Sequence, residues 1–304
     1  MVNVQILMGV YEGAAHLDAQ LQSLAEQDHA DWCLRTSDDS PTDASRAIIM
    51  AFAARVTQQV VVNHGPKQGF AANFMHLFRT GPAGYWALSD QDDVWLPDKL
   101  SRALSALERV PKDEPALYCA RSIYWDGAAR RKPSPPMPRR PTFRNALIEN
   151  VAQGNTIVLN PAAADLARRA AAQAGAVFAH DWWLYMLVTG AGGQVLVDNG
   201  PPVLLYRQHA GNLLGSGHSL RAQVARKLAV MQGAFAKRLD LNLQAMERCR
   251  GWLQPDHADL LDAFCAARRL PLPSRLPALA KLRLYRQRQA GTVGFWGAAL
   301  LGRI

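Results

Sequence analysis

The feature that most constrains the fold of this 304-residue chain is an apolar segment that ends abruptly in three carboxylates. Tyr85–Ser89 has the length and residue types of a buried strand, and Asp90, Asp92 and Asp93 follow at once. Carboxylates this close repel one another and lose solvation when buried, so packing alone does not account for them. A divalent cation such as Mg²⁺ or Mn²⁺ relieves this repulsion, and it is typically held by one or two carboxylates together with substrate phosphates.

Two interpretations of this acidic cluster follow from its residues alone. In open α/β sheets, ligands bind beyond the carboxyl ends of the strands, which favours a metal–diphosphate site. The alternative is a solvated acidic turn that caps a helix beginning near Pro97, because Asp is common at turns and at helix N-caps.

Residues 1–107 alternate between strand and helix patterns four times. This alternation predicts an α/β fold with right-handed crossovers and a mostly parallel sheet covered on both faces. The predicted strands are Val2–Met8, Trp32–Thr36, Val60–Asn63 and Tyr85–Ser89. The polar clusters that follow the strands then lie on one edge of the sheet, where a nucleotide would bind.

After residue 107 the alternation loosens. Ala116–Tyr124 is predicted to be a strand, whereas residues 127–142 hold five prolines and five basic residues, which predicts a loop without regular structure. Gly154-Asn155-Thr156 is expected to lead a short strand, and Pro161 to begin an alanine-rich helix. Residues 194–197 and 203–205 have strand patterns.

Charge divides the chain into two regions. Residues 1–220 hold 19 Lys and Arg against 20 Asp and Glu, whereas residues 221–304 hold 15 against 5. The whole basic excess therefore belongs to the last quarter, which is predicted to be helical. No stretch approaches the ~20 apolar residues of a membrane-spanning helix, and the chain enters a strand without a signal peptide. The four cysteines have no metal-ligand spacing and are expected to be reduced.

The order of the motifs resembles that of the family 2 glycosyltransferases, most closely their bacterial rhamnosyltransferase-like branch. The resemblance spans about residues 2–215, and its motifs are Val10-Tyr11, Ser37-Asp38-Asp39, Gly65–Gly69, Asp90–Asp93, His180–Trp183 and Tyr206–His209. It implies a GT-A fold over residues 1–220, with a nucleotide-sugar-binding half (about 1–110) and an acceptor-binding half (about 111–220). It also implies an inverting, metal-dependent transfer of a sugar from a nucleotide-sugar.

The resemblance assigns donor-binding residues in the first half. Asp38 and Asp39 match the pair that approaches the base and the ribose, although Asp38 has helix capping as an alternative. Asp90 suits the ribose. The remaining residues on the donor side are Val10, Tyr11, Gln91 and Lys67, the last of which is otherwise a solvated turn residue.

The resemblance also implies a cation, Mg²⁺ or Mn²⁺. Asp92 and Asp93 suit its coordination, and His209 stands where the family supplies a further metal or diphosphate contact. A hydrogen-bonded structural histidine is the alternative for His209.

Asp181 matches the position of the general base, which takes the proton of the acceptor hydroxyl as that hydroxyl attacks the anomeric carbon. Acceptor contacts are expected from Gly154 and Asn155 and from Trp182 and Trp183, which could stack on a sugar. Core packing is the alternative for the two tryptophans, and we expect it to hold for one of them.

The sequence departs from the family at three positions near the site. Val10-Tyr11-Glu12 replaces the usual Thr-Tyr-Asn, Pro41 stiffens the turn after the Asp pair, and His180 replaces the acidic residue that often precedes the base. The first two changes touch the nucleotide pocket and weaken any inference about the base. None of the three removes a chemically required group.

Two other classes of function compete with glycosyl transfer. A nucleotidyltransferase also combines an α/β sheet with a metal-binding Asp pair, but it typically carries a basic glycine-rich loop after its first strand. Here that loop is 9–13, Gly-Val-Tyr-Glu-Gly, without a basic residue. A non-catalytic nucleotide- or glycan-binding protein could lose Asp181, which this chain retains. No nucleic-acid-binding module is recognisable, so no nucleic-acid partner is expected.

We therefore expect a cytoplasmic, peripheral membrane glycosyltransferase of bacterial surface polysaccharide synthesis. dTDP-rhamnose is the expected donor, with UDP-hexoses as the alternative, and the acceptor is a saccharide or a lipid-linked saccharide. Basic amphipathic segments such as 220–243 and 276–304 bind anionic leaflet surfaces, which predicts contact with the inner face of the membrane. The alternative is that these helices only pack on the catalytic domain or form a dimer.

Overall fold

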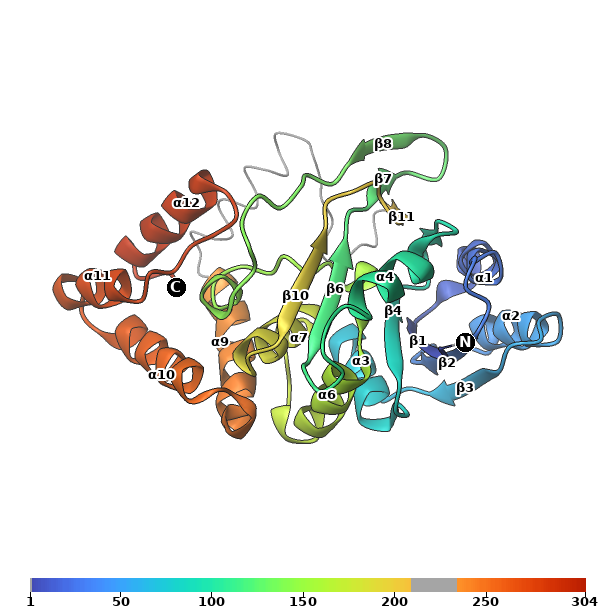
Figure 1. The fold of residues 1–304 in the computed structure, drawn as a ribbon, viewed down its shortest axis with the longest axis horizontal. Coiled ribbons are helices and arrows are strands. Elements are labelled where there is room, and N and C mark those ends of the chain that lie inside the picture. Colours follow the sequence, from blue (N-terminus) through green and yellow to red (C-terminus); the bar gives the residue numbers. More distant parts are fainter. Residues whose placement is uncertain (1, 209–233) are drawn as a thin grey trace.

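The computed structural model describes residues 2–208 and 234–304 (Figure 1). Within them, a central sheet has helices on both faces, and the last helices extend one end of the molecule. His209, the start of the predicted 220–243 helix and the predicted boundary at residue 220 lie outside the described residues.

The main sheet has seven strands in the order β10-β6-β9-β4-β1-β2-β3. Its strands are β1 (Val4–Val10), β2 (Trp32–Asp38), β3 (Val60–His64), β4 (Tyr85–Ser89), β6 (Ala116–Ala120), β9 (Val158–Leu159) and β10 (Gln194–Asp198). Strands β1, β2, β3 and β4 run parallel to one another, as the alternation predicts. The two-residue strand β9 runs antiparallel between β4 and β6, and it joins the two halves of the sheet.

A second sheet of four short strands has the order β5-β11-β7-β8. The strands are β5 (Val94–Trp95), β7 (Ile123–Trp125), β8 (Arg130–Pro133) and β11 (Leu204–Arg207). The single strand predicted over 116–124 is wrong, because its residues divide between β6 and β7. The prediction of no regular structure over 127–142 is also wrong, because β8 forms there. Pro133 is tolerated since β8 is an edge strand, where a missing N–H breaks no central ladder.

Two separate hydrophobic clusters pack on the two faces of the main sheet. One face is covered by α1 (Leu17–Ala25), α2 (Ala44–Ala53) and α4 (Lys99–Leu107), and the other by α3 (Phe70–Thr80), α6 (Pro161–Ala174) and α7 (His180–Gly190). Strand β1 serves both clusters because its side chains alternate: Ile6 and Met8 belong to one and Leu7 to the other. Shorter elements are η1 (Gly13–Ala15), α5 (Phe143–Ala146), η2 (Gly154–Thr156) and η3 (Arg250–Trp252).

Four α-helices follow residue 233 and extend the cluster formed by α3, α6 and α7. They are α9 (Ala234–Arg248), α10 (Pro255–Arg269), α11 (Leu272–Lys281) and α12 (Gln289–Leu300). Helix α9 packs on α6 and α7, and it buries Leu239, Leu243 and Met246. Helix α9 therefore packs on the catalytic domain. In the two described stretches, no helix has the length and apolar character needed to cross a membrane. All four cysteines are free and buried, as expected.

Candidate active site

The ends of the first three strands bring the predicted donor residues to one edge of the sheet. Val10 pairs with Asp38 in the register of β1 and β2, and Asp38 pairs with His64 in that of β2 and β3. The segments after β1 and β2 stay hydrogen-bonded to each other, because the backbone N–H of Asp39 donates to the carbonyl of Val10 at 2.8 Å. The predicted nucleotide edge is thus a continuous backbone surface, with Asp38 and Asp39 beside the end of β1.

Asp38 and Asp39 are both buried and both shape the turns that follow them. Oδ1 of Asp38 accepts a hydrogen bond from the backbone N–H of Ser40 at 2.9 Å, and Oδ1 of Asp39 accepts from that of Lys67 at 2.7 Å. The latter bond holds Lys67 in the left-handed region, at φ 57°. Helix capping by Asp38 is wrong, because Asp43 is the N-cap residue of α2, and even its side chain makes no capping bond.

Tyr11 and Gln91 form a reciprocal pair across this edge. The N–H of Tyr11 donates to Oε1 of Gln91, and Nε2 of Gln91 donates to the carbonyl of Tyr11, each at 2.8 Å. The pair fits closely, since a Cβ added at Gly13 would lie 2.3 Å from Oε1 of Gln91. Gln91 therefore ties the end of β1 to the acidic turn after β4, while the ring of Tyr11 is 58% exposed.

The three carboxylates of the acidic turn occupy different environments. Asp90 and Asp92 are partly exposed, whereas Asp93 is fully buried. Asp93 accepts hydrogen bonds from the side-chain amide of Asn155 and from the backbone N–H of Arg207, the latter at 3.1 Å. Asp93 therefore connects the turn to η2 and to β11, which places it in the protein interior rather than at a surface open to substrate.

A fully buried lysine lies beneath this turn. Nζ of Lys99 donates to the carbonyl of Asn155 at 2.7 Å and lies 3.1 Å from the centroid of the Trp95 ring. Sequence reasoning missed Lys99, although a signal was present: it stands four residues before Ala103 and eight before Leu107, on the buried face of α4.

Burial and charge set the protonation of this group. Burial, together with the negative charges of Asp92 and Asp181, raises the pKa of Asp90 to about 7. Burial and the charges of Asp90 and Asp92 raise the pKa of Asp93 as well. Burial lowers the pKa of Lys99, and the nearby carboxylates oppose that shift. All three shifts favour the neutral form of the group, because three carboxylates and one lysine are crowded together at the buried side of the turn.

The oxygen donors of the turn fit a hard divalent cation, whose charge would relieve the repulsion that raises the pKa of Asp90. Within residues 2–208 and 234–304, no three His, Cys, Asp or Glu side chains converge as a ready ligand set. In Mg²⁺-type sites, substrate phosphates and water supply much of the coordination.

Asp181 lies in the first turn of α7, and three other residues donate hydrogen bonds to its carboxylate. Oδ2 accepts from the backbone N–H of Gly154 at 3.2 Å, Oδ1 accepts from that of Trp182 at 2.7 Å, and the side chain of Asn150 also donates. Burial raises the pKa of Asp181 to about 6 despite these bonds. The negative charge of Asp181 also contributes to the raised pKa of Asp90.

His180, directly before Asp181, is enclosed by aromatic rings. It stacks on Phe74 with 3.8 Å between ring centroids, and Phe70 and Phe78 meet it edge-on. Burial lowers its pKa to about 3, so the imidazole is neutral at physiological pH. Among the described residues its two ring nitrogens have no hydrogen-bond partner. His180 thus anchors the start of α7 by packing rather than by charge.

The predicted acceptor contacts of the two tryptophans are corrected by their burial. Trp183 is fully buried and stacks on Phe78, and Trp182 is 5% exposed with Nε1 donating to the carbonyl of Ala146. Neither ring presents a face to a saccharide, so core packing holds for both rather than for one. Gly154 and Asn155 are also buried, and they contact Asp181 and Asp93 instead of solvent.

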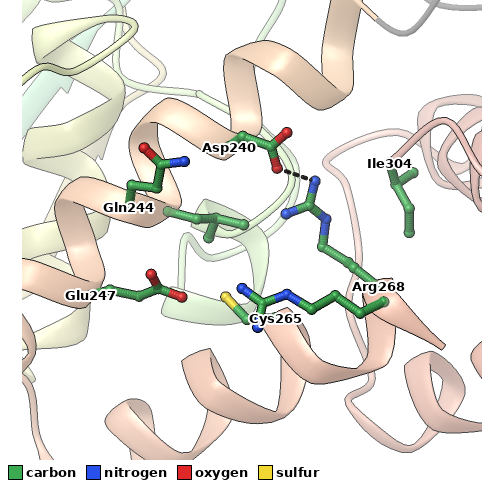
Figure 2. Close-up of a pocket in the computed structure, with 8 residues that line it drawn as sticks. Asp240, Gln244, Glu247, Cys265, Arg268 and Ile304 are labelled. Atoms are coloured by element: carbon green, nitrogen blue, oxygen red, sulfur yellow. Dashed lines mark hydrogen bonds and ion pairs between the residues drawn. The ribbon is translucent and has the colours of Figure 1, made fainter.

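A cavity of about 230 Å³ lies among the helices after residue 233 (Figure 2). It is lined from α9 and α10 by an ion pair, Arg268 with Asp240 at 2.7 Å, and by Glu247 and Cys265. None of the predicted site residues lines it. It is therefore separate from the carboxylate edge.

The sequence profile of glycosyl transferase family 2 matches residues 5–172. The chain belongs to this family. The match covers more than half of the chain, includes the acidic turn and ends before Asp181. Membership favours glycosyl transfer over the nucleotidyltransferase and non-catalytic alternatives, and this family 2 glycosyltransferase is an enzyme of the transferase class.

Relatives and solved structures agree with the family. The chain is 26% identical over 232 residues to the dTDP-rhamnosyl transferase RfbG of Shigella flexneri, covering 72% of this chain and 77% of that one. It is 30% identical over 190 residues to the uncharacterized protein Rv1520 of Mycobacterium tuberculosis, covering 61% of this chain and 52% of that one.

Two solved structures share the GT-A fold of this chain. The mannosyltransferase PcManGT of Pyrobaculum calidifontis, in complex with GDP-Man and Mn2+, superposes with a TM-score of 0.52 at 17% identity, covering 99% of this chain and 85% of that one. S. aureus TarS 1-349 in complex with UDP superposes with a TM-score of 0.54 at 11% identity, covering 99% of this chain and 89% of that one.

Proposed function

We propose that this glycosyltransferase moves a sugar from a nucleotide-sugar to an acceptor hydroxyl with inversion, and that Asp181 is its general base. One observation carries the proposal: the adjacent residues Gly154 and Asn155 donate hydrogen bonds to Asp181 and to Asp93, so the candidate base lies close to the acidic turn although the two come from different halves of the chain. In-line displacement at an anomeric carbon requires a base carboxylate near the bound donor.

The donor nucleotide would lie along the strand edge. The exposed ring of Tyr11 offers a stacking surface for the base, beside the backbone of Val10. Asp38 and Asp39 use Oδ1 for their turns, so Oδ2 of each can accept a hydrogen bond from the base or the ribose. We assign Asp90 to the ribose and Lys67, which is exposed, to the negative charge of the donor.

A bound Mg²⁺ or Mn²⁺ would stabilise the charge that develops on the leaving diphosphate. We propose Asp92 as its protein ligand, because Asp92 is partly exposed. Asp93, the other predicted ligand, would have a structural role instead, because it accepts hydrogen bonds from Asn155 and Arg207. His209 keeps its proposed role as a further contact, and it lies outside the described residues.

Asp181 would accept the proton of the acceptor hydroxyl while the hydroxyl oxygen forms its bond to the anomeric carbon. The bond from that carbon to the diphosphate breaks in the same step, and the electron pair leaves with the nucleoside diphosphate. With a pKa of about 6, Asp181 is ionised at neutral pH. Its pKa is also near enough to neutral pH for efficient proton acceptance.

We propose rhamnose from dTDP-rhamnose as the donor sugar, supported by the likeness to RfbG. A UDP-hexose is the second candidate, since a glucosyltransferase of Escherichia coli that uses UDP-Glc is 25% identical over 104 residues. The acceptor would be a saccharide or lipid-linked saccharide of a bacterial surface polysaccharide, met at the inner face of the cell membrane.

A thermal-shift screen tests the donor. dTDP-rhamnose with Mn²⁺ should raise the melting temperature, because a ligand stabilises only the state that binds it, and chelator should remove most of the shift. Free rhamnose is the matched control and should give no shift. If neither dTDP-rhamnose nor any UDP-hexose stabilises the protein, with or without Mn²⁺, the proposed donor class is wrong.

A further inference from the structure

The last helix of the C-terminal group, α12, leaves one apolar face exposed. The helix contains no charged residue, and its buried face consists of Phe295, Ala298 and Ala299. The opposite face carries Ala290, Val293, Gly294, Gly297, Leu300 and Leu301, all exposed. These positions recur at the spacing of one helical stripe. We call this set the α12 face.

The exposure of the α12 face is large for side chains of this kind. Val293 is 71% exposed, Leu300 53% and Leu301 58%. Added Cβ atoms at Gly294 and Gly297 would meet no atom within 4 Å in the described part of the chain. Clustered exposed apolar residues of this kind mark sites that bind a partner or a membrane, whereas singly scattered ones do not.

The charge around the α12 face selects the occupant. Residues 263–304 contain eight Lys and Arg and no Asp or Glu. Arg288 directly precedes α12 and Arg303 follows it, and both are exposed. Lys281 at the end of α11 and Arg283 in the connection to α12 are exposed as well. A second copy of this chain would bring the same positive charges against these residues, which disfavours a symmetric dimer through this face.

We infer that the α12 face docks on an anionic lipid leaflet, and that α12 lies in the plane of the interface. A twelve-residue helix is about 18 Å long, against a hydrocarbon thickness of about 30 Å, so it can lie on a bilayer but not span one. Trp296, half-buried at the edge of the face, has the amphipathic ring favoured at that depth. The inference deepens the proposed membrane location of the enzyme by naming the surface.

Vesicle co-sedimentation with the full chain tests this inference. Phosphatidylcholine vesicles that contain phosphatidylglycerol should pellet the protein, and pure phosphatidylcholine vesicles should pellet much less. Leu300→Ser with Leu301→Ser should weaken binding by at least about tenfold, because two exposed leucines lose their burial in the interface. Both side chains are exposed, so the fold should persist. Met50→Ser on α2, a residue 52% exposed, is the matched control and should bind as the wild type does.

Charge variants separate electrostatic from apolar docking. Arg288→Gln with Arg303→Gln should lower the affinity for anionic vesicles by about fivefold for each charge removed. Added salt should lower the affinity of the wild type to nearly that of this variant. Arg109→Gln, an exposed arginine on the catalytic half, should change little. Equal pelleting of the Leu300→Ser, Leu301→Ser variant and the wild type would overturn the inference. So would a wild type that ignores vesicles and forms a dimer which this variant abolishes.

The result is independent of the proposed chemistry. Transfer to a soluble saccharide acceptor should be unchanged in all of these variants, because none lies at the carboxylate edge. A chain that binds vesicles as described but transfers no sugar would contradict the proposed function alone, and a chain that transfers sugar but ignores vesicles would contradict the docking alone.

Discussion

The backbone N–H of Gly154 donates a hydrogen bond to Oδ2 of Asp181, with 3.2 Å between nitrogen and oxygen. The side-chain amide of the next residue, Asn155, donates a hydrogen bond to Asp93, and its backbone carbonyl accepts one from Nζ of Lys99. One short helical turn, η2, therefore holds both the proposed base and the acidic turn of the donor side. The distance between the two halves of the site depends on this turn, which explains why Gly154 and Asn155 are buried rather than open to an acceptor.

Asp181→Asn should lower turnover by about 10²–10⁴-fold, because the amide keeps the size of the side chain but cannot accept a proton. Donor affinity should stay nearly unchanged, since the role proposed for Asp181 is towards the acceptor hydroxyl. Steady-state kinetics and donor titration measure the two quantities, and Asp165→Asn on the surface of α6 is the control. Ordinary turnover in Asp181→Asn would show that another group is the base.

The pH profile should report the same carboxylate. The pKa of Asp181 is about 6, so the active, ionised form is lost as pH falls through 6, and kcat/KM should fall about tenfold for each unit below it. Asn150 donates to the carboxylate and lowers its pKa, so Asn150→Ala should move this acidic limb to higher pH. A limb that stays in place would separate it from Asp181, provided that circular dichroism shows folded protein throughout.

Much of the nucleotide half could be predicted from the sequence, because its elements have strong local patterns. The strand Tyr85–Ser89 has the predicted bounds, and the strand from Val60 ends one residue later than predicted. The 116–124 segment was not predictable in the same way. Its two strands are separated only by Arg121 and Ser122, and the second pairs with β11, which lies far away in sequence. Local periodicity carries no information about such pairing.

The site residues divide along similar lines. The carboxylates after Ser89 are visible as a pattern in the sequence, whereas the proposed roles of Asp38 and Asp181 come from the resemblance to the family's motifs. Sequence reasoning could not tell Asp92 from Asp93, since neighbours in sequence differ here only in which one faces the interior. The burial of Trp182 and Trp183 depends on α3 and α9 packing over α7, a tertiary arrangement that a two-residue motif does not encode.

Asp92 and Asp93 should respond differently to the same substitution. Asp92→Asn should weaken Mn²⁺-dependent binding of dTDP by more than about tenfold, by analogy with other losses at metal sites, while the fold persists. Asp93→Asn should instead reduce the free energy of unfolding, because a buried carboxylate with two donors is replaced. Calorimetric titration and chemical denaturation separate the outcomes. If Asp93→Asn folds normally and loses the Mn²⁺ dependence, Asp93 is a metal ligand as the sequence alone predicts.

Lys99→Met should strongly destabilise the fold. Methionine keeps a flexible apolar stem against Trp95 but removes a buried positive charge that lowers the pKa of Asp90 and so favours its anion. Removing one member of a buried charged group typically costs about 3–5 kcal/mol, because the remaining charge is left uncompensated. Urea denaturation measures the loss. Lys281→Met, at an exposed lysine, is the control and should change stability by less than about 0.5 kcal/mol.

The double variant Lys99→Met, Asp93→Asn decides whether the two residues act through their charges. If Lys99 stabilises the fold chiefly by compensating Asp93, the double variant should be more stable than the sum of the two single losses predicts, by about 0.5–3 kcal/mol. Strict additivity would mean that Lys99 acts through its hydrogen bond to Asn155 and its contact with Trp95. In that case Lys99→Arg, which keeps the charge, should be as damaging as Lys99→Met, because the larger guanidinium cannot fit the same buried contacts.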